Sequence, residues 1–138
     1  MRLVLLDSSV IVALFDRSQL AHSACVEVVR GLAGPFLTCE AVIVESCHLL
    51  RNLEGAREAV LENIAAGIFQ ISFQISQEAS AVKALLTKYR DRRIDLADAC
   101  LIVLANEHET GDILTLDNDF RIYRWGRNRP FRILPALP

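Results

Sequence analysis

Short hydrophobic runs alternate with longer segments of helical periodicity along the chain. The short runs are rich in leucine and β-branched residues, and the strands expected from them are 3–6, 36–38, 69–73, 112–116 and 131–134. The longer segments predict helices over residues 9–15, 21–34, 41–53, 55–67, 76–90 and about 96–109. Strands separated by helices need crossover connections, so this order predicts an α/β fold with a parallel sheet covered on both faces.

The composition is that of one compact domain. The chain has 138 residues, of which 52% are hydrophobic and 23% charged, so it is long enough to bury a core, and we interpret residues 1–138 as a single domain. No apolar stretch reaches the roughly 18 residues of a membrane span. Asp7 interrupts the first apolar run too early for a signal peptide. We therefore expect a cytoplasmic protein that has no membrane partner.

The four cysteines do not suggest a zinc site. They form no C-x-x-C pair, no histidine stands at metal-binding spacing from them, and they fall in apolar segments, at Cys25, Cys39, Cys47 and Cys100. We expect reduced, buried thiols.

Two aspartates stand at the start of the most apolar helix. Residues 94–105 read IDLADACLIVLA, and a helix that is hydrophobic all round is a buried one. Asp95 suits the N-cap, and Asp98 falls at the third helical position, where it would complete a pair like a capping box. Both charges would also suit the positive end of the helix dipole. A purely structural role therefore accounts for the pair when it is considered alone.

The positions of the other acids favour a shared site. In open α/β sheets, ligands bind outside the carboxyl ends of the strands. Asp7 follows the first strand and Asp117 follows the strand 112–116, while Glu45 and Asp98 lie near the starts of their helices. Each has a structural alternative: Asp7 as a helix cap, Asp117 as a turn residue and Glu45 as a solvated helix residue. Glu45 fits its alternative least well, because its helical neighbours are largely apolar and a buried charge needs a partner.

Four gathered carboxylates would repel one another unless a cation neutralised them. Oxygen ligands favour Mg²⁺ or Mn²⁺, and four acids suit one or two such ions. These ions support phosphodiester hydrolysis by activating water, with no side-chain nucleophile. The sequence also lacks a G-x-S-x-G motif, a Walker loop and a G-x-G-x-x-G motif.

Four stretches resemble the PIN-domain nucleases, and most closely the VapC-type ribonuclease toxins of toxin–antitoxin pairs. They occur in the family's order as LLDSSVIVALF, AVIVESCHLL, DLADACLIVLA and ILTLDNDF. The resemblance implies a three-layer α/β/α sandwich with a central parallel sheet of four to five strands. It also implies Mg²⁺- or Mn²⁺-dependent endoribonuclease activity on RNA, a homodimer, and a small antitoxin protein as partner.

By position, the resemblance makes Asp7, Glu45, Asp98 and Asp117 the metal-binding and catalytic acids. Three further residues are expected close behind these ligands or beside the substrate: Ser9, Asp95 and Asp119. For Ser9 a helix cap is the structural alternative, and Asp95 is assigned chiefly to capping.

The end of the chain is basic. Residues 1–120 carry a net charge of −7, and residues 121–138 carry +5 from arginines alone. Arginine pairs with phosphates and aromatic rings stack on unpaired bases, so this segment is a candidate RNA-binding surface formed by Arg121, Arg124, Trp125, Arg127 and Arg129. The charged run 90–93 is a candidate extension of this surface. The structural alternative is a solvated loop in which Trp125 covers the core.

Other classes of protein fit less well. A receiver domain needs a lysine at the end of a late strand, whereas Lys83 and Lys88 both lie in an expected helix. A haloacid-dehalogenase-like phosphatase needs an acid two residues after Asp7, where Ser9 stands. Two alternatives stay open: a partner-binding PIN-like module with little catalysis, and a PIN nuclease of RNA processing that is not a toxin.

Overall fold

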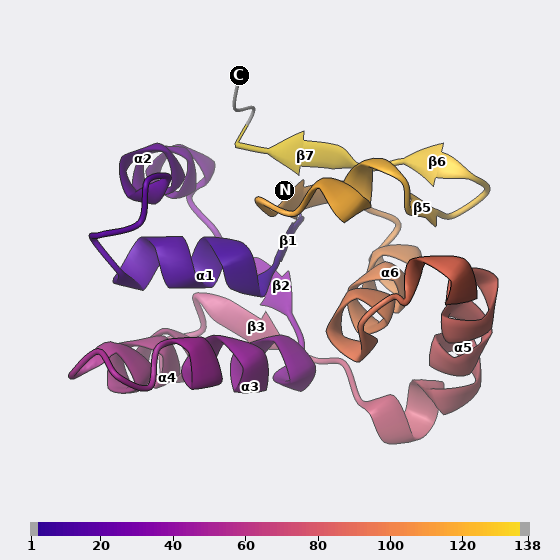
Figure 1. Cartoon of the computed structure of the whole chain (residues 1–138), viewed down its shortest axis with the longest axis horizontal. Helices are drawn as coiled ribbons and strands as arrows, with labels where there is room; N and C mark the ends of the chain where they lie inside the picture. Colours follow the sequence, from indigo (N-terminus) through magenta and orange to yellow (C-terminus); the bar gives the residue numbers. More distant parts are fainter. Residues whose placement is uncertain (1–2, 136–138) are drawn as a thin grey trace.

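A five-stranded parallel sheet forms the centre of the computed structural model, which describes residues 3–135 (Figure 1). The strand order is β3-β2-β1-β4-β7, and every neighbouring pair is parallel. The bounds are β1 (Val4–Leu6), β2 (Phe36–Thr38), β3 (Phe69–Ile71), β4 (Asp112–Leu114) and β7 (Arg132–Leu134). The ends of the predicted domain, residues 1–2 and 136–138, lie outside the described residues.

Helices cover both faces of this sheet and complete the predicted three-layer α/β/α sandwich (Figure 1). The chain moves outward from β1 to β2 to β3 and then returns to β4 on the other side of β1. Because crossovers are right-handed, helices made on the outward and return paths lie on opposite faces. One face carries α1 (Ser8–Phe15), α2 (His22–Leu32), α3 (Glu40–Leu49) and α4 (Ala56–Ala65). The other carries α5 (Ile75–Lys88) and α6 (Leu96–His108).

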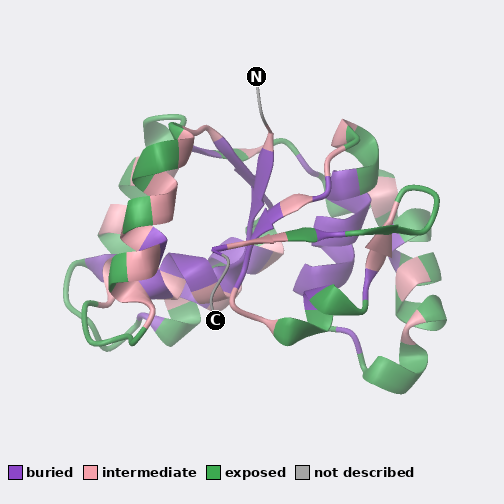
Figure 2. Cartoon of the chain, turned by 90° about the horizontal axis from the view of Figure 1, so that it is seen from above, coloured by how far each residue is buried: buried purple, intermediate pink, exposed green. Residues whose placement is uncertain are grey.

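The core lies between the sheet and the inner sides of these helices (Figure 2). Every residue of β1 and β2 is buried, as expected for central parallel strands. Helix α6 is buried continuously from Ala97 to Ala105, which confirms the prediction made from its apolar run. Within residues 3–135, no helix combines the length and the hydrophobicity needed to cross a membrane.

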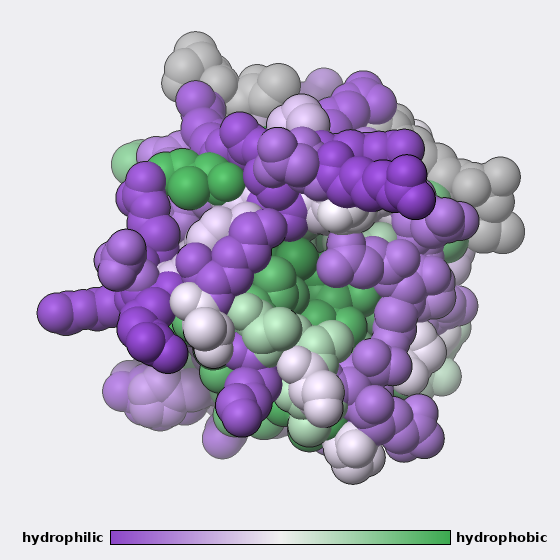
Figure 3. All heavy atoms as spheres, turned by 90° about the vertical axis from the view of Figure 1, so that its right-hand side faces the viewer, coloured by the Kyte–Doolittle hydropathy of each residue, from purple (hydrophilic) through white to green (hydrophobic). Residues whose placement is uncertain are grey.

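The predicted elements are all present, and the structure also contains short elements that the pattern did not indicate. Two short 3₁₀ turns occur, η1 (Arg90–Arg92) and η2 (Asn118–Arg121), and a small antiparallel hairpin joins β5 (Arg124–Trp125) to β6 (Arg129–Pro130). Figure 3 looks onto the end of the molecule formed by α5 and this hairpin, where hydrophilic side chains surround a hydrophobic hollow. The hairpin escapes a pattern search because its four paired residues show no hydrophobic alternation.

Candidate metal centre

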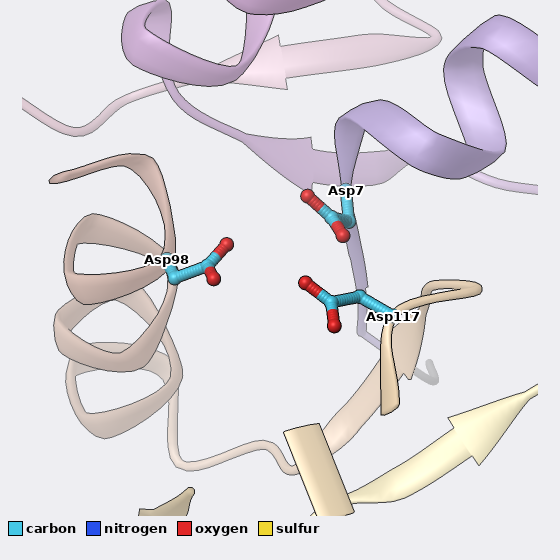
Figure 4. A group of neighbouring side chains, drawn as sticks. All are labelled: Asp7, Asp98 and Asp117. Carbon is cyan, nitrogen blue, oxygen red and sulfur yellow. The ribbon is translucent and has the colours of Figure 1, made fainter. Parts of the chain in front are cut away.

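Three aspartates meet at the point where the strand order reverses, between β1 and β4. Asp7 directly follows β1, Asp117 lies three residues after β4, and Asp98 is the third residue of α6. Each offers a carboxylate oxygen, and these oxygens all lie within 4.8 Å of one another. Figure 4 shows the three carboxylates pointing toward one another from two strand ends and the facing helix. The edge predicted from the sequence is therefore where these acids gather.

Hydrogen bonds from neighbouring residues fix the carboxylate of Asp7. Its Oδ1 accepts the backbone N–H of Ser8 at 2.7 Å, and its Oδ2 accepts the hydroxyl of Thr115 at 2.6 Å. Asp7 is thus the N-cap of α1 as well as a member of the cluster. Burial raises the pKa of Asp7, while the bonds from Thr115 and Ser8 act in the opposite direction.

Thr115 connects Asp7 to Asp117. While its hydroxyl donates to Asp7, its oxygen accepts the backbone N–H of Asp117 at 3.0 Å. The carboxylate of Asp117 accepts the backbone N–H of Asp119 at 2.9 Å and so starts η2. Asp119 itself is exposed and lies outside the group of three acids.

The surroundings of Asp98 favour its protonated form. This residue is buried, and burial, together with the negative charges of neighbouring acids, raises its pKa to about 8; these acids are Asp7, Asp117, Asp95 and Glu45. All of these neighbouring charges are negative, so none of them stabilises the ionised form of Asp98. At neutral pH a proton therefore remains on Asp98 until a cation replaces it.

Glu45 lies beside the three aspartates rather than among them. It is half-buried on α3, and its Oε1 accepts the hydroxyl of Ser8 at 2.6 Å. Its charge also raises the pKa of Asp7 and Asp98. The predicted fourth acid is therefore joined to the cluster through Ser8.

Asp95 does not use its side chain in the way that the sequence suggested. It occupies the N-cap position of α6, but its carboxylate makes no capping hydrogen bond. The side chain is exposed and lines a groove of about 610 Å³ between α3 and α6, together with Glu45 and His48. The prediction of a side-chain cap is therefore wrong, although Asp95 has the extended backbone that is typical of an N-cap residue.

Hydroxyl groups hold the acids in place, and the sequence identified only one of them. The hydroxyl of Ser9 lies 3.3 Å from Asp7 Oδ2 and accepts the N–H of Leu116 at 2.9 Å. Ser8 and Thr115 were missed. The available signal was their spacing, since one directly follows Asp7 and the other stands two residues before Asp117.

The structure divides the proposed RNA-binding residues into two groups. The Arg124 Nη1 donates to three carbonyl oxygens at the end of η2, and the Trp125 indole N–H donates to the Pro130 carbonyl at 3.2 Å. These bonds give both side chains a structural role, and their assignment to RNA binding stays a prediction. The remaining three are exposed: Arg121, Arg127 and Arg129. Arg129 also stacks its guanidinium on Trp125, 5.2 Å from the ring centre.

The donor set fits a hard divalent cation. All the ligand atoms offered are carboxylate oxygens, which Mg²⁺ and Mn²⁺ prefer over softer ions. The negative charges that raise the pKa of Asp98 would be balanced by such an ion. The three aspartates therefore fit a divalent cation.

Comparison with known proteins gives consistent matches. The model of the PIN-domain family matches residues 4–126. Ribonuclease VapC26 of Mycobacterium tuberculosis (strain ATCC 25618 / H37Rv) is 33% identical over 116 residues, which is 83% of this chain and 86% of that protein. The crystal structure of M. tuberculosis VapC20, described as a sarcin-ricin loop cleaving toxin, aligns with a TM-score of 0.77. This alignment covers 92% of this chain and 99% of the VapC20 chain, at 17% sequence identity. It therefore supports the fold.

Proposed function

Because the chain belongs to the PIN-domain family, we propose that it is a metal-dependent endoribonuclease that hydrolyses RNA phosphodiester bonds. We further propose that it is the toxin of a type II toxin–antitoxin pair. The named ribonuclease VapC26, which aligns over most of both chains, supports the activity and the toxin class.

The observation that carries the proposal is the approach of three carboxylates within 4.8 Å at the switch point of the sheet. A structural role needs only one capping acid at each helix start. Bringing Asp98 beside two other acids places mutually repelling charges in a buried site, which is costly without a cation. We assign Asp7, Asp98 and Asp117 as direct ligands of one or two Mg²⁺ or Mn²⁺ ions.

The chemistry needs a water nucleophile and a stabilised phosphate charge. A divalent ion supplies both by lowering the pKa of water and by neutralising phosphate oxygens. Asp7 is held in one orientation by Ser8 and Thr115, so its oxygens are positioned before metal binding. Glu45, oriented by Ser8, is placed to accept a proton or to bind through water at the groove side of the site. Asp119 and Ser9 act by positioning Asp117 and Asp7.

Partners follow from the same family membership. We propose an RNA substrate and a small antitoxin protein, as the toxin class requires. The homodimer and the cytoplasmic location stay predictions from the sequence.

The test is cleavage of total RNA by purified protein in Mg²⁺, Mn²⁺ and EDTA, with two variants beside the wild type. Asp98→Asn removes a proposed ligand and should abolish cleavage. Asp95→Asn removes a carboxylate three residues away and should retain most activity. Metal-dependent discrete fragments that disappear only with Asp98→Asn would support the proposal. Absence of cleavage by folded, antitoxin-free wild type would favour a partner-binding module, and equal losses in both variants would contradict the ligand assignment.

A further inference from the structure

Two arginine-rich segments lie close in sequence to the acids of the metal centre, one before α6 and one after β4. The first contains Arg90, Arg92 and Arg93, named here the η1 arginines, and it leads within two residues to Asp95 at the start of α6. The second begins at Arg121, two residues after Asp119. Residues 1–120, with the η1 arginines included, carry a net charge of −7, which opposes the approach of a polyanion. These segments are therefore the places where such a ligand is attracted.

The fold joins the two segments. The hydroxyl of Tyr89, directly before the η1 arginines, accepts the backbone N–H of Arg124 at 2.9 Å. The ring of Tyr89 also packs edge-on against Tyr123, with centres 4.9 Å apart. Tyr123 is buried, and the charges of Asp98, Asp119 and other acids add to the effect of burial in raising its pKa. Tyr123 therefore packs against the residue that precedes the η1 arginines and is also influenced by the charges of the acid cluster.

The side chains of the η1 arginines are available to a ligand. All three are exposed, and within residues 3–135 the structure gives their guanidinium groups no hydrogen bond or salt bridge. Arg124 differs, since its guanidinium is occupied by backbone carbonyls of η2. Figure 3 shows hydrophilic side chains across this end of the molecule, above the hydrophobic hollow.

We propose that the η1 arginines bind the phosphate backbone of the RNA strand beside the start of α6, and so hold the scissile phosphodiester at the three aspartates. This inference rests on the proposed function and adds the residues that position the substrate. Arginine suits the task because its planar fork pairs with phosphate oxygens in two hydrogen bonds. The contacts are to phosphates, so they fix the position of the strand without reading its bases.

Arg93 offers a variant that separates binding from folding. Its backbone is left-handed, with φ of 53°, a conformation that glycine adopts without steric cost. Arg93→Gly therefore removes the guanidinium and relieves the backbone, and its melting temperature should equal or exceed that of the wild type. Arg92→Gln removes a second guanidinium, and Arg57→Gln on α4 is the control for loss of one exposed charge elsewhere.

The first measurement is the affinity for a labelled single-stranded RNA, determined by fluorescence anisotropy in EDTA over a range of salt concentrations. Removing one arginine–phosphate pair should reduce the slope of log K against log salt by about 0.7. We expect this reduction for Arg93→Gly and Arg92→Gln, and an unchanged slope for Arg57→Gln. Unchanged slopes in the η1 variants, or the same reduction in Arg57→Gln, would overturn the inference.

The second measurement separates substrate positioning from chemistry. Bis(4-nitrophenyl) phosphate is a diester without an RNA strand, so the η1 variants should hydrolyse it with Mn²⁺ at the wild-type rate while RNA cleavage falls tenfold or more. Wild-type rates on RNA in both variants would overturn the inference and leave the proposed function standing. Loss of both reactions in folded η1 variants would also overturn it. A wild-type protein that hydrolyses neither substrate would instead overturn the proposed function.

Discussion

Two hydroxyl groups determine how the acids of the metal centre are oriented. Thr115 joins Asp7 to Asp117, and Ser8 joins α1 to Glu45 across 37 positions of sequence. The acids themselves could be predicted because carboxylates after strands and at helix starts form a recognisable pattern. The hydroxyls could not, because a serine beside an aspartate is also an ordinary helix start, and only the packing of α3 shows which one faces Glu45.

Ser8→Ala should weaken metal binding without unfolding the protein. The backbone N–H of Ser8 still holds Asp7, but Glu45 loses its 2.6 Å hydrogen bond and becomes free to rotate. Loss of such supporting interactions lowers metal affinity by about 10- to 100-fold, so the Mg²⁺ concentration for half-maximal cleavage should rise by about tenfold or more. Ser46→Ala is the control, since the hydroxyl of Ser46 donates to the Val42 carbonyl on the same helix and, among residues 3–135, makes no hydrogen bond to an acid. An equal effect of both substitutions would contradict the role of Ser8.

The raised pKa of Asp98 should make the metal-free protein less stable as the pH rises. In the unfolded chain this carboxyl ionises near 3.8, whereas in the folded chain its pKa is about 8. Between these values the folded state holds a proton that the unfolded state has released, so the free energy of unfolding decreases as the pH increases through this range. Asp98→Asn removes that contribution.

Thermal unfolding in EDTA at pH 5 and pH 8.5 measures this effect. From pH 5 to pH 8.5, the melting temperature of the wild type should fall by more than that of Asp98→Asn. At pH 8.5 the variant should melt at least roughly 4 °C higher, corresponding to about 1 kcal/mol or more in a domain of this size. Identical pH dependence in the two proteins would show that Asp98 ionises normally.

Helices and strands with strong patterns were predicted closely, whereas the hairpin, which is held by contacts with distant residues, was not. Helix α6 was expected over about 96–109 and is found at Leu96–His108, because its apolar run can only be a buried helix. One of these contacts is the packing of Trp125 against Gly111, between residues 14 positions apart. The basic character of this segment suggested a solvated loop, and the sequence alone could not decide where the indole lies.

Gly111→Ala tests this contact. A Cβ at Gly111 would overlap the indole nitrogen of Trp125, so the hairpin must move or the backbone must shift. Such overpacking typically costs about 1–3 kcal/mol, and the urea midpoint should fall accordingly. The comparison is Gly31→Ala in α2, where a Cβ meets nothing within 4 Å and the helix should gain about 0.5–1 kcal/mol. A destabilisation in both, or in neither, would contradict the account of the hairpin.

The whole molecule concentrates opposite charges in different regions. Its parallel sheet brings acids from three separate segments to one edge, while the arginines occupy the neighbouring surface of η1 and the basic tail. Fold and site are therefore coupled: the topology that buries the strands also creates the repulsion between Asp7, Asp98 and Asp117. The metal-free fold carries this unfavourable interaction, and a bound cation removes it.

Mg²⁺ should consequently stabilise the entire fold, because a ligand that binds only the folded state raises its stability by RT ln(1 + [L]/Kd), or about 2.7 kcal/mol at a hundredfold excess over Kd. The melting temperature of the wild type should rise with the logarithm of the Mg²⁺ concentration once this exceeds Kd, without reaching a plateau. KCl of matched ionic strength should give a smaller rise, since screening weakens the repulsion without supplying a ligand. Asp7→Asn, which retains an oxygen at the same position but loses its charge, should respond less to Mg²⁺ than the wild type. Equal stabilisation by Mg²⁺ and KCl would mean that the three acids do not form a metal site.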